Sequence, residues 1–105
     1  MEKIRIKIPK EQITAFCIKW DIVEFALFGS VLRDDFNSDS DIDVLVTFAE
    51  RAEHTLFDLV RMENELKRIF AHEIDIVSKR GIEASRNYLR RNAILNSAEP
   101  VYAAG

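Results

Sequence analysis

Short apolar segments with the composition of β-strands alternate along this chain with stretches of helical periodicity, and this order constrains the fold more than any other feature. The strand-like segments span residues 24–28, 42–48 and 73–78, and the second is rich in β-branched residues. Between the last two lies a stretch, 50–70, whose apolar side chains recur at helical spacing. This order predicts an α/β (or α+β) protein: a small mixed β-sheet with helices packed on one face.

The region before the first strand is expected to be helical. Pro9 suits the first turn of a helix, and Ile13, Phe16, Cys17 and Trp20 then follow at i, i+3, i+4 and i+7. This spacing places the four side chains on one stripe that faces the core. Since Cys17 lies on that stripe and is the only cysteine, we expect a buried, unpaired thiol.

The remaining elements are shorter or less regular. A short helix is expected over residues 31–35 and a last helix over 82–95, after which Pro100 interrupts the pattern. Lys3 to Ile8 alternates charged residues with isoleucine and predicts a short edge strand or an extended arm. No linker, repeat or low-complexity segment divides the 105 residues, so residues 1–105 are expected to form one domain.

Composition and charge exclude several classes of protein. Hydrophobic residues make up 48% and charged residues 31%, as in soluble globular proteins. No apolar run is long enough to cross a bilayer, and the N-terminus lacks the apolar segment of a secretory signal. We therefore expect a cytoplasmic protein with no membrane contact. The net charge of −3 argues against direct binding of long nucleic acids through a broad basic surface.

Acidic residues crowd one short stretch of the chain. Five aspartates fall within ten positions: Asp34, Asp35, Asp39, Asp41 and Asp43. Such a cluster is unfavourable unless it is solvated, protonated or holding cations. On a strand that begins at residue 42, Asp41 and Asp43 would share one face of the sheet. They are either a pair of solvated acids at a strand start or ligands of a hard cation such as Mg²⁺.

A third acid is positioned to join this pair. Asp75 is flanked by Ile74 and Ile76, so the alternation of a strand puts its carboxylate on the face opposite to theirs. If that strand lies beside 42–48, three carboxylates can hold two metal ions about 4 Å apart. One ion would activate the attacking group and the other would stabilise a triphosphate and its pyrophosphate leaving group. Asp75 would lie nearest the acceptor and take its proton.

A glycine turn precedes the acidic stretch. Gly29-Ser30 follows an apolar strand directly, and glycine permits both a sharp turn and the close approach of another group. A helix beginning at Ser30 would direct free N–H groups and a hydroxyl toward an anion. The alternative is a turn that only caps a helix.

Together these features resemble a known family. The segment LFGSVLRDDFNSDSDIDVLV is similar to the motif of the polymerase-β-type nucleotidyltransferases, and the short chain resembles their minimal nucleotidyltransferase (MNT) branch. The resemblance implies a polymerase-β-like palm core. It also implies that Gly29 and Ser30 form the phosphate-binding turn, that Asp41 and Asp43 are the metal-binding pair, and that Asp75 is the third carboxylate.

Neighbouring positions both follow and depart from the family pattern. Arg33 resembles an arginine often found after the Gly-Ser turn; on a helix it would share the face of Ser30 and meet phosphate, or it would instead pair with the nearby acids. Many minimal members have arginine where this chain has Val31, and glycine where it has Asp34. These departures remove one positive charge and add one negative charge near the expected phosphates.

The resemblance also implies a biological role. It suggests a metal-dependent nucleotidyltransferase that uses two Mg²⁺ ions to transfer AMP from ATP to a protein hydroxyl. The implied acceptor is a tyrosine of a HEPN-type ribonuclease toxin, for which the chain would be the antitoxin. A chain this short would recognise its acceptor through a partner chain or through homo- or hetero-oligomerisation, unless the acceptor is very small. The alternatives are a non-catalytic antitoxin that only binds the toxin, and a nucleotidyltransferase that acts on a small molecule.

The C-terminal region offers candidate contact residues. Lys79 and Arg80 follow the third predicted strand and are candidates for binding the triphosphate. Apolar and aromatic side chains of the last helix and tail either contact a partner or, for most of them, complete the core: Tyr88, Leu89, Ile94, Leu95, Val101 and Tyr102.

Overall fold

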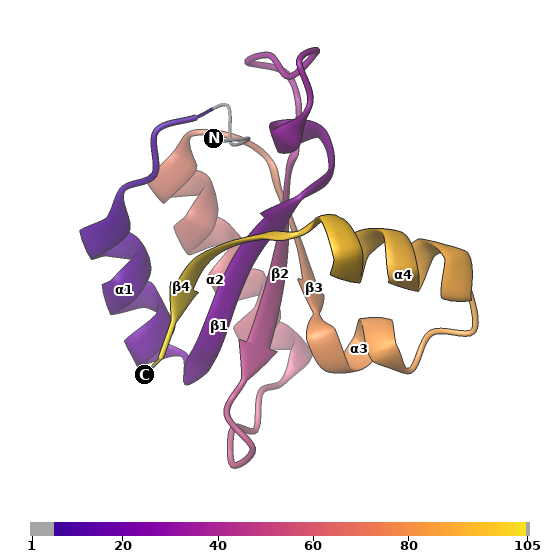
Figure 1. Cartoon of the computed structure of the whole chain (residues 1–105). Coiled ribbons are helices and arrows are strands. Elements are labelled where there is room, and N and C mark those ends of the chain that lie inside the picture. The colour runs from indigo at the N-terminus through magenta and orange to yellow at the C-terminus, as the bar shows by residue number, and fades with distance from the viewer. Residues whose placement is uncertain (1–5, 105) are drawn as a thin grey trace.

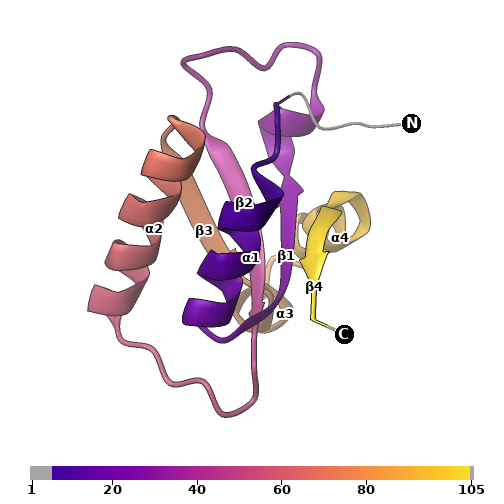
Figure 2. The same cartoon turned by 90° about the vertical axis from the view of Figure 1, so that its left-hand side faces the viewer.

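The computed structural model describes residues 6–104, which form a four-stranded sheet with helices on both faces (Figures 1 and 2). In chain order the elements are α1 (Lys10–Lys19), β1 (Ile22–Phe28), a single 3-10 turn η1 (Gly29–Leu32), β2 (Ile42–Phe48), α2 (Leu56–Phe70), β3 (Ile74–Ser78), α3 (Lys79–Glu83), α4 (Tyr88–Ser97) and β4 (Glu99–Ala103). Residues 1–5 and 105 lie outside the described part.

The sheet has the strand order β3-β2-β1-β4. β2 and β3 are parallel and are joined by α2, whereas β1 is antiparallel to both β2 and β4. The sheet is therefore mixed, as predicted. Because β1 runs against β2 and β3, its C-terminal end meets the N-terminal ends of those two strands at the upper edge in Figure 1.

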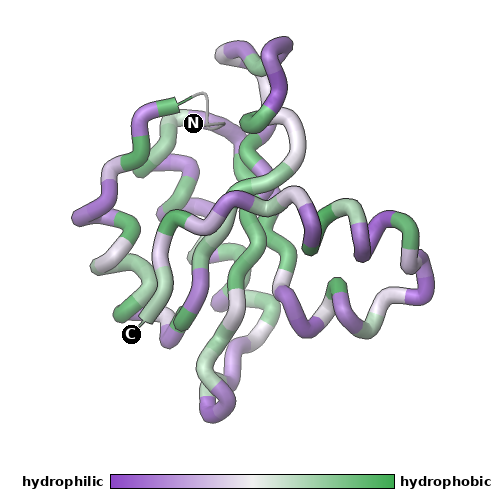
Figure 3. Tube along the Cα trace, viewed as in Figure 1, coloured by the Kyte–Doolittle hydropathy of each residue, from purple (hydrophilic) through white to green (hydrophobic). Residues whose placement is uncertain are grey.

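The main core lies between the sheet and the helices α1 and α2. Ile42, Val44 and Val46 alternate along β2 toward these helices and are fully buried, as their period of two predicts. Buried residues of the two helices meet them: Ile13, Phe16 and Cys17 from α1, and Met62, Leu66 and Phe70 from α2. Figure 3 shows hydrophobic colour concentrated on the strands and alternating colour along these helices. The buried, free thiol predicted for Cys17 is confirmed.

A second, smaller core lies on the opposite face of the sheet. Phe28 of β1 and Leu45 of β2 point to this face, and Ile82 of α3 and Ile94 of α4 pack against them. The expectation of helices on one face only is therefore wrong. These strands bury apolar side chains on both faces, so each face needs a helical cover.

The helix α2 begins later than its periodicity suggests, at Leu56 rather than at residue 50. Thr55 and Asp58 form a reciprocal capping box: the Asp58 N–H donates to Thr55 Oγ1 at 3.2 Å, and the Thr55 N–H donates to Asp58 Oδ2 at 3.0 Å. The box satisfies free N–H groups of the first turn and fixes the helix start.

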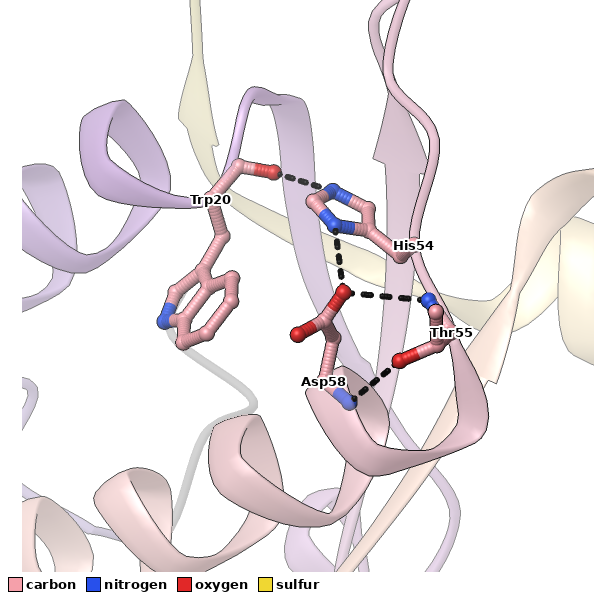
Figure 4. Close-up of polar contacts among 4 residues, drawn as sticks. All are labelled: Trp20, His54, Thr55 and Asp58. Atoms are coloured by element: carbon pink, nitrogen blue, oxygen red, sulfur yellow. Dashed lines mark hydrogen bonds and ion pairs between the residues drawn. The ribbon is translucent and has the colours of Figure 1, made fainter.

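A histidine next to this box ties the loop before α2 to the end of α1 (Figure 4). His54 Nε2 lies 2.8 Å from the main-chain oxygen of Trp20, and His54 Nδ1 lies 3.8 Å from Asp58 Oδ2. The imidazole also packs against the rings of Trp20 and Phe48. We call this arrangement the His54 clamp; it lies at the C-terminal end of β2, where Phe48 is the last residue.

The single helix expected over residues 82–95 is instead two helices, α3 and α4. Side chains that cap helices explain both starts. Ser78 Oγ accepts a hydrogen bond from the Gly81 N–H at 3.0 Å, and Asn87 Oδ1 accepts one from the Arg90 N–H at 3.1 Å. The cap at Asn87 begins a new helix after the chain has turned.

The strand β4 was not predicted. Pro100 was expected to interrupt structure, yet it lies within β4, where the pairing with β1 shifts register between Phe25 and Ala26. Proline is tolerated on an edge strand because its missing N–H costs no ladder bond there. Of the stretch from Lys3 to Ile8, residues 3–5 lie outside the described part and residues 6–8 form neither strand nor helix. Within residues 6–104, no helix has the length and apolarity needed to span a bilayer.

Candidate active site

The glycine turn lies at the end of the sheet where the C-terminal end of β1 meets the N-terminal ends of β2 and β3. Gly29 has φ +74, a left-handed conformation that favours glycine, and η1 makes one 3-10 turn that ends at Leu32. The short helix expected over 31–35 is therefore shorter and begins earlier. Arg33 follows in extended conformation.

Asp43 packs directly on this turn. It is the register partner of Phe28 on β1, and a Cβ atom built on Gly29 would overlap the Asp43 carboxylate. The carboxylate also accepts a hydrogen bond from the Ser30 backbone N–H. The absence of a side chain at position 29 thus lets a carboxylate lie against the main chain, the close approach that a glycine here permits.

Asp75 lies beside Asp43 on the same face of the sheet. The two residues are paired in register on the parallel strands β3 and β2, and residues at paired positions project to one side. Burial raises the pKa of Asp43, and the negative charges of Asp75 and Asp41 raise it further. Asp41 lies one residue before β2, close enough for its charge to act on Asp43.

The three acids have the chemistry that a magnesium site needs. Asp43 is held against the turn, whereas the side chains of Asp41 and Asp75 are exposed, so both are free to adjust to an ion. Hard divalent cations take carboxylate oxygens and bridge to phosphates. Among the residues that the structure describes, no three acidic, histidine or cysteine side chains are gathered in a metal-holding arrangement.

This geometry agrees with comparisons to known proteins. A family model described as "Nucleotidyltransferase domain" matches residues 9–99. The chain belongs to the nucleotidyltransferase family. It is 34% identical over 92 residues to a protein of Methanocaldococcus jannaschii named "Putative protein adenylyltransferase MJ0435", an alignment that covers 88% of this chain and 92% of that protein.

Solved structures of similar proteins share the fold. A structure described as a "putative minimal nucleotidyltransferase" has 35% sequence identity and a TM-score of 0.66, and the match covers 87% of each chain. A complex of a tri-AMPylated HEPN toxin from Shewanella oneidensis with an MNT antitoxin matches with a TM-score of 0.60 at 15% identity, over 90% of this chain and 70% of the other. At that identity the second match shows the fold alone.

Val31 departs from the family pattern and Arg33 follows it, and the structure shows where each lies in this nucleotidyltransferase. Val31 is fully buried in the main core, so position 31 presents no side chain to the acidic site. The positive charge of Arg33 lowers the pKa of Asp43, opposing the neighbouring acids. Arg33 therefore lies near enough to the site for its charge to act there, although it is not on a helix as expected.

The other basic candidates lie elsewhere in this nucleotidyltransferase. Lys79 and Arg80 begin α3, which follows the C-terminal end of β3, whereas Asp75 lies near the N-terminal end of that strand. Figure 1 shows α3 at the lower end of the sheet, away from the glycine turn. The expected contact of these two residues with the triphosphate therefore does not fit their positions.

The candidate partner residues of the C-terminal region divide as expected. Most contribute to packing: Ile94 is buried, and Leu95, Val101 and Tyr102 are partly buried against the two cores. Tyr88 and Leu89 are exposed, with 60% and 71% of their surfaces accessible.

Two hydrogen bonds next to the nucleotidyltransferase site were not predicted from the sequence. Ser30 Oγ donates a hydrogen bond to the Asp41 main-chain oxygen at 2.9 Å. His72, which was not among the candidate site residues, has Nδ1 2.9 Å from the main-chain oxygen of Ser40. Both bonds join segments that are far apart in sequence, and no local pattern announces them.

Proposed function

We propose that this nucleotidyltransferase transfers AMP from ATP to a protein hydroxyl, with Asp41, Asp43 and Asp75 as ligands of Mg²⁺ ions. The observation that carries the proposal is the register of β2 and β3, which sets Asp43 beside Asp75 next to the Gly29 turn. Convergence of three acids is costly for a folded protein. Their placement is explained if the site holds cations and a triphosphate.

Each residue then has a definite task. When bound, Mg²⁺ neutralises the triphosphate and the developing charge on pyrophosphate. Asp41 and Asp43 hold and orient the ions, and the Ser30 backbone N–H keeps the Asp43 carboxylate in place. Asp75 accepts the proton of the acceptor hydroxyl. The hydroxyl oxygen forms a bond to the α-phosphorus as the bond from that phosphorus to pyrophosphate breaks.

The acceptor that we propose is a tyrosine of a HEPN-type toxin, which makes the chain an antitoxin that acts as one domain over residues 1–105. Two relatives support this assignment. One bears the name of a protein adenylyltransferase, and another is an MNT antitoxin in complex with an AMPylated HEPN toxin. ATP as donor and a toxin as acceptor are consistent with a cytoplasmic location.

The direct test is transfer of label from α-labelled ATP to a co-purified HEPN-type partner in the presence of Mg²⁺. We expect Asp41→Asn, Asp43→Asn and Asp75→Asn each to lower the rate at least 100-fold, because each removes a metal-binding charge. Asp39→Asn is the matched control: it makes the same charge change in the same acidic stretch, on an exposed side chain outside the three-acid set. It should transfer at nearly the wild-type rate.

The same variants separate catalysis from simple binding. If Asp43→Asn neutralises the toxin as well as the wild type does, the chain is a binding antitoxin and transfer is not its means of action. If the wild type labels a small acceptor such as an aminoglycoside but not the protein, the proposed acceptor is wrong. Circular dichroism of each variant confirms that the fold is intact.

A further inference from the structure

A histidine between α2 and β3 is hydrogen-bonded to the end of the acidic loop. The helix α2 ends at Phe70, and its C-cap Ala71 turns the chain through a left-handed conformation (φ 58). His72 follows, and its Nδ1 lies 2.9 Å from the Ser40 main-chain oxygen. A carbonyl oxygen only accepts hydrogen bonds, so Nδ1 carries the proton. The ring of Phe36 packs on the imidazole with centroids 5.1 Å apart and planes inclined at 31°.

The loop that His72 holds is internally bonded. Asn37 Oδ1 accepts a hydrogen bond from the Asp39 N–H at 2.8 Å, and the Asn37 N–H donates to Ser40 Oγ at 3.1 Å. The Ser40 N–H donates back to the Asn37 main-chain oxygen at 3.0 Å. Because these bonds make residues 37–40 a single turn, a shift of Ser40 moves the residue that follows it, Asp41.

The main chain around Asp41 is held from both sides of the strand. Its own carbonyl accepts the hydrogen bond from Ser30 Oγ at 2.9 Å. The next N–H, that of Ile42, donates to the Glu73 main-chain oxygen at 2.8 Å. With His72 on the Ser40 carbonyl, the two peptide groups that flank Asp41 are both tied to neighbouring segments.

We propose that His72 is a positioning residue for nucleotidyl transfer, acting through Ser40 to set where Asp41 presents its carboxylate; this inference rests on the proposed function. The side chain of Asp41 is exposed, so no packing holds it and its location depends on its main chain. Residues that orient metal ligands typically contribute about 10–100-fold in metal affinity or activity. Loss of the His72 hydrogen bond should therefore weaken Mg²⁺ use before it weakens the fold.

The His54 clamp supplies a matched control. There too, a half-buried imidazole packs on an aromatic ring and bonds a main-chain oxygen, that of Trp20, at 2.8 Å. His54 packs on Phe48 at the C-terminal end of β2, whereas Asp43 and Asp75 lie near the N-terminal ends of β2 and β3. A purely structural effect of losing such a histidine should therefore appear equally at both positions.

The experiment compares His72→Leu, which removes the donor, with His72→Asn, whose amide nitrogen lies near the position of Nδ1. His54→Leu and His54→Gln are the controls, since the glutamine amide nitrogen lies near the position of Nε2. The readouts are the Mg²⁺ concentration at half-maximal transfer and the urea midpoint. We expect His72→Leu to raise the Mg²⁺ requirement about tenfold, His72→Asn to restore it to within about threefold, and His54→Leu to lower the urea midpoint alone.

Two results would overturn the proposal: an unchanged Mg²⁺ requirement in His72→Leu, or the same increase in His54→Leu. If His72→Leu does not fold, His72→Gln takes its place, because its longer side chain carries the amide beyond the Nδ1 position. If the wild type transfers no label, the proposed function fails. The role of His72 is then tested by the rise of the melting temperature on addition of Mg²⁺ alone. The Mg²⁺ concentration needed for that rise is expected to be about tenfold higher for His72→Leu than for the wild type.

Discussion

At the scale of single residues, the contact between Gly29 and Asp43 leaves no room for a side chain at position 29. A side chain at position 29 meets two separate penalties. The left-handed backbone costs an L-residue about 1–2 kcal/mol, and a Cβ there would overlap the Asp43 carboxylate. Position 29 therefore governs both the stability of the turn and the place of the Asp43 carboxylate, a proposed metal ligand.

We expect Gly29→Ala to lower the free energy of unfolding by about 1–2 kcal/mol or more and to reduce transfer at least tenfold, because the methyl group displaces the carboxylate. Urea denaturation and labelled-ATP assays measure the two effects. Repeating the urea denaturation in an Asp43→Ala background separates the two penalties on stability, since the overlap disappears there and the backbone cost remains. Equal costs in both backgrounds would show that the overlap is relieved without loss.

The thiol of Cys17 provides a prediction about pH. Burial raises the pKa of Cys17 to about 12, and only the thiolate is a good nucleophile. We expect the folded protein to react with iodoacetamide far more slowly than the urea-unfolded chain at pH 8, and its reactivity to stay low until strongly alkaline pH. Mass spectrometry of the alkylated protein follows the reaction. Fast labelling of folded protein at pH 8 would contradict the buried placement.

Residue patterns predicted some contacts of the site and not others. The period of two predicted that Asp41, Asp43 and Asp75 share one face, and the register of β2 and β3 pairs Asp43 with Asp75; the roles of the three acids as metal ligands stay a prediction. The bonds from Ser30 to Asp41 and from His72 to Ser40 join segments 11 and 32 residues apart. Such contacts depend on how strands and loops are brought together, which no local pattern specifies.

At the scale of secondary structure, caps decide where helices begin. Residues 50–55 contain no glycine or proline that would mark a helix end, which explains the overlong prediction. The pattern Thr55-x-x-Asp58 is a capping-box signature and marks the true start. Between α3 and α4, Asn87 has the same effect on a sequence that otherwise reads as one helix.

We expect Thr55→Ala to lower the free energy of unfolding by about 1 kcal/mol, the usual contribution of an N-cap side chain. The hydroxyl accepts the Asp58 N–H, and alanine leaves that donor without its partner in the protein. Guanidinium denaturation at pH 7 measures the change. Ser97→Ala, which removes a hydroxyl bonded within α4 at Ala93, should cost much less, since such bonds within a helix add little.

The other half of the box should depend on acidity. The backbone hydrogen bond from Thr55 lowers the pKa of Asp58 below its ordinary value of 3.8, and the Thr55 side chain and the charges of His54 and Arg61 also lower it. A lowered pKa means that the contribution of Asp58 is fully present above pH 3.8 and is lost as the pH falls through the folded pKa. Asp58→Asn should thus be less stable than wild type at pH 6, and the difference should shrink below pH 3.8. A constant difference across that range would contradict the assignment.

At the scale of the whole molecule, the order of elements predicted the class of fold but not how the sheet is completed. The alternation of strands and helices indicated a mixed sheet, which the structure has. Pro100 concealed β4, because a proline usually argues against a strand unless it lies on an edge. The smaller core around Phe28 and Leu45 was missed because a short apolar run does not reveal that both of its faces are buried.

The strand β4 protects β1 from exposure as an edge. Val101 and Tyr102 pack on the main core, and β4 covers the main-chain groups of Phe25 and Leu27. We expect a chain ended at Ala98 to lose roughly 2–3 kcal/mol from these half-buried side chains and to self-associate through the bared strand. Size-exclusion chromatography with light scattering detects the association. Val101→Ala retains the strand and should lower stability while the oligomeric state stays that of the wild type.

The Asp43 carboxylate packs onto a position that has no side chain, so the substitutions tolerated at positions 29 and 43 depend on each other. Homologues that had lost catalytic activity could not freely vary position 29 while an acid remained opposite it, because every larger residue would overlap that acid. A substitution of the glycine would be tolerated only after the acid had been replaced by a smaller residue. Among inactive homologues, glycine at position 29 facing a small neutral residue at position 43 would then be an intermediate stage. The reverse combination, a bulky residue facing an intact aspartate, should be rare.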